Sequence, residues 1–369
     1  MFKYVKLIQF LLLCLPLTLS TQEKGVRDYG IIIGELTPGP NNAITDVKGV
    51  TVGHYTLIEG KNVRTGVTAI LPHQGNIFQD KVPAAIYIGN GFGKLVGYSQ
   101  VEELGNLETP IVLTNTLSVF TAAEALIEYT LNQPGNENIR SVNPVVGETN
   151  DGYLNDIRGL HIKKNHILQA IKNAHSGPVK QGAIGAGTGT ICFGYKGGMG
   201  TASRKLSEDL GRFTLGVLVQ TNFGGDLTIK GIAIEPELEK KTDDIPDGSC
   251  MIVVATDAPV GARNLKRLAK RALFGLARTG GIGSNGSGDY VIAFSTAPEV
   301  RIHYKTDSQY QQIRELRNGD MTPLFDAVIE ATEEAILNSL FYAEQVKDVS
   351  PLPVAQVIKI LKEHNLAGR

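Results

Sequence analysis

The sequence has almost no net charge. Lys and Arg number 36 against 37 Asp and Glu, which leaves a formal net charge of −1 over 369 residues. Proteins whose main partner is nucleic acid or an anionic membrane surface carry a clear excess of positive charge. We therefore expect neither partner for the mature chain. The 42% of hydrophobic residues and 20% of charged residues are typical of a globular protein with a large core.

Cysteine is scarce as well. The chain has three cysteines, and Cys14 lies in an N-terminal segment that we expect to be removed, so only Cys192 and Cys250 remain. Two cysteines allow one disulfide at most and exclude a disulfide framework. They also form no Cys-x-x-Cys pair, the spacing that would indicate a zinc site.

The common nucleotide and metal motifs are missing. Residues 281–286 (GIGSNG) match the letters of the dinucleotide fingerprint, but they follow an expected helix and precede an expected strand. That order is the reverse of the one that places a pyrophosphate at a helix N-terminus. There is no Gly-Lys-Ser/Thr loop and no His-Glu-x-x-His, and His161 and His166 lie five residues apart, off a common helix face. We expect no cofactor and no metal ion.

A Ser-His-Asp triad has no clear motif either. No Gly-x-Ser-x-Gly elbow occurs, and residues 285–289 (NGSGD) match only half of one before they lead into an expected strand. A nucleophilic serine in this chain would therefore need a base other than histidine.

The first twenty residues have the pattern of a signal peptide. Lys3 and Lys6 form a basic start, residues 7–19 are mainly apolar, and Thr18 and Ser20 are small enough to precede a cleavage site. The apolar part is too short for a comfortable membrane span, which makes an uncleaved anchor the weaker alternative. We expect residues 1–20 to be removed and the mature chain to be exported, to the periplasm or outside the cell.

Strand-like and helix-like segments are mixed along the mature chain. Short apolar runs predict strands at residues 30–34, 50–57, 84–88, 110–115, 183–191, 213–222, 251–256 and 289–295. Apolar residues at helical spacing predict helices at residues 119–131, 165–174, 262–278, 324–346 and 354–364.

The apolar strands indicate how these segments are layered. Several, such as residues 251–255 (MIVVA), are apolar on both faces, so helices must cover the sheets. Long non-helical connections argue against a regular alternation of strands and helices, and favour two sheets between helical layers. The one break in composition, residues 237–248 (ELEKKTDDIPDG), predicts an exposed loop that interrupts a single domain, residues 21–369.

A serine stands where this loop meets the next strand, in the stretch DGSCMIVVAT (residues 247–256). Asp-Gly-Ser is common in turns, which is the simplest interpretation. If the bond between Gly248 and Ser249 were cut, however, Ser249 would gain an α-amine with an unperturbed pKa of roughly 7.7–8.0. Such an amine is a suitable general base for its own hydroxyl near neutral pH, and Gly248 leaves room around the carbonyl under attack.

The chain resembles the self-cleaving N-terminal-serine aminopeptidases, the family of the L-aminopeptidase/D-esterase and the β-peptidyl aminopeptidases. The resemblance covers nearly the whole mature chain, and its segments together are highly specific. They are LTPGPNNAITDVKGVTVGH (36–54), TGVTAILPH (65–73), NGFGKLVGYSQVEELGNLETPIVLTNTLSV (90–119), NPVVGETNDGYLNDI (143–157), VLVQTNFG (217–224), GSCMIVVATDAP (248–259) and SNGSGDYVIAFSTA (284–297).

The resemblance implies a fold and an assembly. The fold would be a four-layer αββα sandwich, N-terminal-nucleophile-hydrolase-like. Self-cleavage after Gly248 would give a large fragment, residues 21–248, and a small fragment, residues 249–369, which remain interlocked. A homo-oligomer of these processed heterodimers is expected, with a short peptide or amino-acid amide as substrate.

The resemblance also implies the site residues. Ser249 would be the nucleophile and Asn222 the oxyanion donor, although an asparagine at a strand end is also common in turns. Ser287 and Asp289 would orient Ser249 and its amine. Glu148 would bind the amino group of the substrate, or alternatively cap the turn that follows it.

One role of the family stays unassigned in this sequence. Some members place a tyrosine just after the glutamate as a second oxyanion donor, whereas this chain has Thr149 and Asn150 there and Tyr153 further on.

Two other functions are compatible with the same fold. One is an acyltransferase like ornithine acetyltransferase, which self-cleaves before a threonine; Ser249 and the export signal disfavour it. The other is a binding protein that has lost activity.

Overall fold

The computed structural model describes residues 24–234, 238 and 248–367. The expected signal peptide and most of the expected loop at 237–248 lie outside the described residues. Within the described ranges, no helix has both the length and the apolar character needed to cross a membrane.

The first sheet contains four strands in the order β1-β2-β5-β6. Its first three strands are antiparallel, and β6 runs parallel to β5. The bounds are β1 (Thr51–Glu59), β2 (Val63–Leu71), β5 (Ile111–Asn115) and β6 (Val145–Thr149). Helices α2 (Val119–Leu131) and α3 (Lys164–Lys172) pack on its outer face through an apolar core.

The second sheet is larger and follows the order β15-β3-β14-β13-β10-β9. Its neighbours are antiparallel except for β13 and β14, which run parallel. The bounds are β3 (Asp80–Gly91), β9 (Met199–Lys205), β10 (Thr214–Asn222), β13 (Ser249–Thr256), β14 (Gly288–Ser295) and β15 (Ile302–His303). Helices α4 (Ala262–Arg278) and α5 (Thr322–Phe341) cover its outer face.

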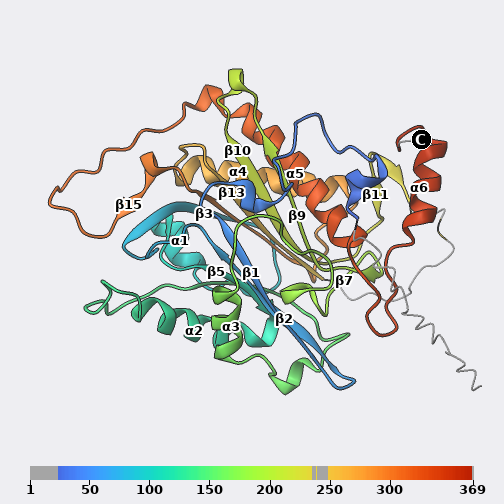
Figure 1. Ribbon diagram of the computed structural model, residues 1–369, viewed down its shortest axis with the longest axis horizontal. Coiled ribbons are helices and arrows are strands. Elements are labelled where there is room, and N and C mark those ends of the chain that lie inside the picture. Colours follow the sequence, from blue (N-terminus) through green and yellow to red (C-terminus); the bar gives the residue numbers. More distant parts are fainter. Residues whose placement is uncertain (1–23, 235–237, 239–247, 368–369) are drawn as a thin grey trace, which may run out of the picture.

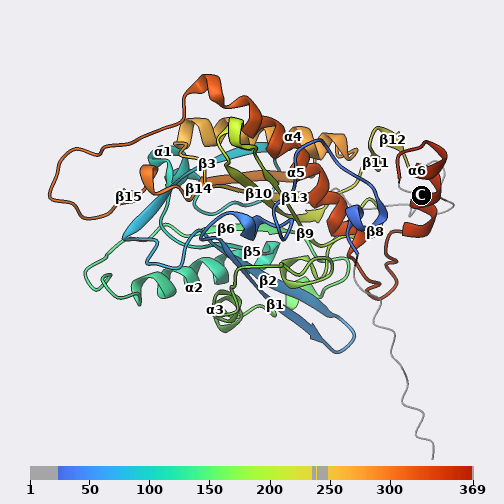
Figure 2. The same ribbon diagram turned by 45° about the horizontal axis from the view of Figure 1, so that its top comes forward.

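The layers stack as helices, sheet, sheet, helices. Figure 1 shows α2 and α3 below the two sheets and α4 and α5 above them, and Figure 2 shows the same order after a 45° turn. A second apolar core fills the space between the sheets. The expected four-layer αββα sandwich is confirmed.

Strand β13 is buried on both faces, which explains its apolar sequence. Met251 and Val253 point into the core between the sheets, whereas Cys250 and Ile252 point into the core under α4 and α5. Because side chains alternate along a strand, Ser249 shares the face of Met251. The first residue of β13 therefore presents its hydroxyl to the space between the two sheets.

Smaller elements complete the chain. Within the described residues, the other α-helices and strands are α1 (Tyr98–Leu104), α6 (Val354–Glu363), β4 (Asn106–Leu107; paired with β3), β7 (Ile191–Cys192), β8 (Tyr195–Lys196), β11 (Thr228–Ile229) and β12 (Ile232–Ala233).

Two expected strands are wrong. Residues 30–34 form no strand, and positive φ values at Gly30 (75°) and Gly34 (71°) show why the extended conformation is interrupted. Residues 183–191 contain instead a short 3-10 helix, Gly185–Gly187, with a positive φ of 53° at Gly185. In both places the backbone is irregular beside glycines, yet neighbouring apolar side chains are buried in the core.

Other elements were missed or misjudged in length. Four elements are not predicted from the sequence: β2, β6, β9 and α1. Their apolar runs are short or contain glycine and charged residues. Helix α5 ends at Phe341 rather than at residue 346.

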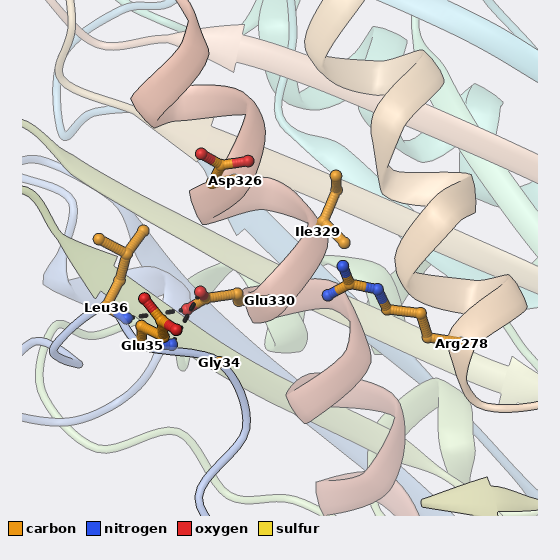
Figure 3. Close-up of a pocket in the computed structure, with 7 residues that line it drawn as sticks. All are labelled: Gly34, Glu35, Leu36, Arg278, Asp326, Ile329 and Glu330. Carbon is orange, nitrogen blue, oxygen red and sulfur yellow. Dashed lines mark hydrogen bonds between the residues drawn. The ribbon is translucent and has the colours of Figure 1, made fainter. Parts of the chain in front are cut away.

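The N-terminal segment is anchored to α5 by buried charges. Arg204 on β9 is fully buried and bonds Glu330 at 2.9 Å and Glu334 at 2.8 Å. Glu330 in turn accepts the backbone N–H groups of Glu35 and Leu36. A cavity of about 400 Å³ lies here, between the N-terminal segment, α4 and α5 (Figure 3), and it is lined by none of the expected site residues.

Candidate active site

Ser249 lies at the start of β13, directly opposite Asn222 in the antiparallel pairing with β10. It is 7% exposed, and its Oγ accepts the backbone N–H of Gly288 at 3.1 Å. Strand β14 thus holds the hydroxyl at the N-terminal end of the interior strand β13, on the face that points toward the first sheet.

Gly248 has no room for a side chain. A Cβ atom at this position would lie 1.7 Å from the backbone oxygen of Asn222 and 3.1 Å from Cα of Phe223. Only glycine fits between Ser249 and the end of β10, because any side chain at this position would collide with the backbone of Asn222.

Asp289 and Ser287 lie on the other side of Ser249, around the start of β14. Asp289 Oδ1 accepts the Ser287 hydroxyl at 2.8 Å and the backbone N–H of Cys250 at 3.1 Å. Asp289 Oδ2 is buried and has no hydrogen-bond partner among the described residues. Burial raises the pKa of this carboxyl from 3.8 to about 6, against the lowering effect of its two hydrogen bonds.

Asn222 is the last residue of β10, and its amide is fixed from both ends. Oδ1 accepts the N–H of Ile191 at 3.0 Å, and Nδ2 donates to the carbonyl of Asn150 at 3.0 Å. An amide nitrogen carries two hydrogens, so Asn222 can donate one to a substrate oxygen and keep its bond to Asn150. This arrangement fits an oxyanion donor beside Ser249.

Glu148 reaches the site from the other sheet. It is 3% exposed near the end of β6, and its oxygens accept the N–H of Lys94 at 2.9 Å and the hydroxyl of Thr116. The turn after it is capped instead by Asn150, whose Oδ1 accepts the N–H of Gly152 at 2.9 Å. Glu148 is therefore a fixed carboxylate at the site rather than a turn cap.

Tyr290 connects Glu148 with Ser249 and was not singled out from the sequence. A Cβ on Gly93 would lie 3.0 Å from Glu148 Oε1 and 3.7 Å from the Tyr290 hydroxyl. A Cβ on Gly288 would lie 3.1 Å from both Ser249 Oγ and Tyr290 Cε2. The alternation of β14 contained the signal, because it places Tyr290 on the face that Ser249 occupies.

A buried lysine, Lys196, holds the loop that orients Asn222. The ammonium of Lys196 donates to three backbone carbonyls of the loop 187–197, at 2.7 to 2.9 Å. Burial lowers the pKa of this ammonium from 10.5 to about 7. The same loop carries the N–H of Ile191 that orients Asn222. In the sequence, the one indication of this role is a single lysine within the glycine-rich stretch 189–200.

The described part of the chain offers no group of three or more His, Cys, Asp or Glu side chains suited to a metal ion. Cys192 and Cys250 are both buried free thiols, which decides the open question of a disulfide between them.

Four of the five expected site residues meet at the starts of β13 and β14 and the end of β10, and Glu148 joins them from β6. A polar cluster with one nucleophile, one amide donor and two carboxylates can carry out acyl transfer.

Comparisons with known proteins agree with this chemistry. Residues 42–351 match the model of peptidase family S58. The β-peptidyl aminopeptidase BapA of Sphingosinicella microcystinivorans is 40% identical over 380 residues, covering 94% of this chain and 93% of that protein.

Solved structures agree as well. The PH0078 protein of Pyrococcus horikoshii OT3 is 46% identical with a TM-score of 0.87, covering 93% of this chain and 99% of that one. An L-aminopeptidase D-Ala-esterase/amidase of Ochrobactrum anthropi, described as a prototype for the serine aminopeptidases and a variant of the Ntn hydrolase fold, is 34% identical. Its TM-score is 0.86, with 93% and 99% of the two chains covered. The chain has this N-terminal-nucleophile-hydrolase type of fold, and it belongs to peptidase family S58 as a hydrolase of the aminopeptidase type.

Proposed function

We propose that this aminopeptidase uses Ser249 as its nucleophile, cleaves itself before Ser249, and removes N-terminal residues from short peptides, amides or esters. The observation that carries the proposal is the position of Ser249. It begins a buried strand, with Asn222 directly opposite and Asp289 bonded to the next residue along the chain.

Self-cleavage starts when the Ser249 hydroxyl attacks the carbonyl carbon of Gly248. The ester C–O bond forms, the peptide C–N bond breaks, and the hydroxyl proton passes to the freed nitrogen of Ser249. Water then hydrolyses the ester, which restores the hydroxyl and leaves a carboxylate on Gly248. The absence of space for a side chain at Gly248 supports a carbonyl held for attack.

Turnover reuses the same hydroxyl with the new α-amine as its base. The amine takes the hydroxyl proton while Oγ attacks the substrate carbonyl, and Asn222 Nδ2 donates to the oxyanion. The protonated amine then gives its proton to the leaving group, and an acyl-enzyme remains on Ser249. Water hydrolyses this ester with the same amine as base.

Asp289 is suited to hold that amine. Its Oδ1 already accepts the N–H of Cys250, one residue beyond the amine, while its buried Oδ2 lacks a partner among the described residues. An N–H of the α-amine of processed Ser249 would supply that partner, and the carboxylate would stabilise the ammonium that forms when the amine takes the hydroxyl proton. Ser287 completes the arrangement by donating to Oδ1 and fixing the plane of the carboxylate.

Glu148 accounts for the restriction to N-terminal residues. A buried carboxylate favours a positively charged partner, and the ammonium of a substrate's first residue would provide one. The bonds from Lys94 and Thr116 keep the carboxylate in place before substrate arrives.

Export and assembly belong to the same proposal. We place the mature enzyme in the periplasm or outside the cell after loss of residues 1–20, working without a cofactor as a homo-oligomer of processed heterodimers. The support is the sequence pattern of the first twenty residues for export and the family resemblance for the assembly.

A single preparation tests the function. Purified protein is incubated with L-, D- and β-aminoacyl nitroanilides, and the chain is analysed on a denaturing gel. The proposal expects two fragments and nitroaniline release from at least one class of substrate. An acyltransferase would need an amine acceptor for turnover, and an inactive binding protein would release nothing.

A further inference from the structure

We infer that the hydroxyl of Tyr290 is a second ligand for the amino group of the substrate, beside Glu148. The inference rests on the proposed function, because it concerns the amino-group site of the same enzyme.

The position of Tyr290 comes from the pairing of β13 with β14. Tyr290 is the partner of Met251 in the parallel register, and both side chains lie in the core between the sheets. Gly288 brings the ring close to Ser249 Oγ, and Gly93 brings the hydroxyl close to Glu148 Oε1. The ring thus spans the distance from the nucleophile to the fixed carboxylate.

The hydroxyl of Tyr290 has an unused hydrogen-bonding capacity. The residue is 4% exposed. Its oxygen is not among the fully buried side-chain atoms that lack a partner, so solvent, and therefore a ligand, can reach it. No hydrogen bond of this hydroxyl is found among the described residues. Each Glu148 oxygen accepts one donor and keeps further acceptor capacity. Glu148 and Tyr290 therefore both offer acceptor positions around Gly93.

The electrostatics favour an ammonium ligand. Burial, and then the negative charges of Glu148 and Asp289, raise the pKa of Tyr290 above its ordinary value, so the phenol is neutral at pH 7. Its oxygen can accept a hydrogen from an ammonium that Glu148 neutralises. A substrate ammonium has three N–H donors, and two protein ligands satisfy more of them than one does.

The location also separates Tyr290 from the oxyanion site. Asn222 belongs to β10, on one side of β13, whereas Tyr290 belongs to β14, on the other side. In a substrate the amino group is carried beside the attacked carbonyl, so the amino group and the oxyanion need separate protein ligands. The hydroxyl of Tyr290 is thus placed for the amino group, while the second oxyanion donor stays unassigned.

The test measures binding without turnover. Leucinol carries an amino group but no scissile bond, and its deaminated analogue lacks the amine. Calorimetry compares both ligands on the wild-type enzyme, Tyr290→Phe, and the matched control Tyr87→Phe on the adjacent strand β3. We expect Tyr290→Phe to weaken leucinol binding about tenfold, as for one hydrogen bond to a charged group, with the analogue unaffected. Tyr87→Phe should match wild type for both.

Two results would overturn the inference. One is unchanged leucinol binding in Tyr290→Phe, and the other is an equal loss for both ligands, which a packing defect would cause. A second measurement uses Glu148→Gln and the double variant. If both residues hold one ammonium, their losses in leucinol affinity are not additive, whereas independent roles would give additive losses. Since these measurements need no catalysis, a failure of the proposed function would appear separately, as absent nitroanilide turnover.

Discussion

The carboxylate of Asp289 accepts the backbone N–H of Cys250 at 3.1 Å, across the parallel strands β14 and β13. This contact ties a buried acid to the residue that follows the proposed nucleophile. Asp289 is therefore placed to respond to the chemical state of the Ser249 nitrogen, which would change from an amide to an amine in the proposed cleavage.

The processed chain should consist of two fragments. Because the bond after Gly248 is the one that the Ser249 hydroxyl can attack, we expect residues 21–248 and 249–369, the second beginning SCMIVVAT. N-terminal sequencing and intact mass of the active protein check this. Full activity in a preparation that contains only the intact mature chain would contradict the mechanism.

Ser249→Ala should abolish both cleavage and hydrolysis, since the variant lacks the attacking oxygen. Ser249→Cys, whose thiol can still attack a carbonyl, should keep some cleavage. Gel analysis over time and nitroanilide kinetics measure the two steps. Wild-type turnover in Ser249→Ala would place the nucleophile elsewhere.

Asp289→Asn should stabilise the unprocessed chain above pH 6. The pKa of Asp289 in the folded state, about 6, exceeds its ordinary value of 3.8. The folded state therefore holds the proton more tightly, and its stability falls as pH rises between these values. Above pH 6 the buried charge costs on the order of 3 kcal/mol. In the Ser249→Ala background, Asp289→Asn should raise Tm by a few degrees at pH 7.5 and leave it unchanged at pH 4. A lower Tm at both pH values would show that the carboxylate is already neutralised.

Glu148→Gln should discriminate between free and blocked amines. Loss of a charge-assisted contact is expected to cost about 1.5–3 kcal/mol, which lowers kcat/KM for a free-amine anilide by one to two powers of ten. The N-acetylated anilide should be poor for wild type and lose nothing further. Self-cleavage should continue, because Gly248 has no free amine in the precursor. Equal losses on both anilides would remove the amino-group role.

Lys196→Met should act on kcat more than on KM. Without the ammonium, three carbonyls of the loop 187–197 lose their donor, and the N–H of Ile191 no longer holds Asn222 firmly. Because Asn222 is the proposed oxyanion donor, we expect kcat to fall about tenfold. Lys81→Met removes another buried lysine and serves as the control, with kcat unchanged. A similar loss of kcat in both variants would mean that general destabilisation, not the position of Asn222, is measured.

The junction at Ser249 could be recognised from sequence because its features are contiguous. A polar loop, a glycine, a serine and an apolar strand follow one another. The structure begins β13 at Ser249, two residues before the strand expected at 251–256. The layered fold could be predicted for a related reason, since strands that are apolar on both faces need covering on both sides. The proposed roles of Tyr290 and Lys196 could not be read from local patterns. Tyr290 approaches Gly93 and Glu148 from a distant strand, and Lys196 acts through a loop whose link to the site is the bond from Ile191 to Asn222. Likewise, strands at 30–34 and 183–191 were expected from apolar composition, while glycines with positive φ decided the backbone.

The strand order of the second sheet has a consequence for refolding. Strands β3, β10 and β9 precede the proposed cut, whereas β14, β13 and β15 follow it, so the two fragments alternate within one sheet. The ion pairs of Arg204 with Glu330 and Glu334 also join the two fragments. The uncut chain would refold in a first-order reaction. Once cut, the protein would have to recover this sheet from two separate molecules, at a rate that depends on their concentration. Cleavage would thus change the molecularity of refolding, and a mature enzyme that unfolds at high dilution would not regain its structure.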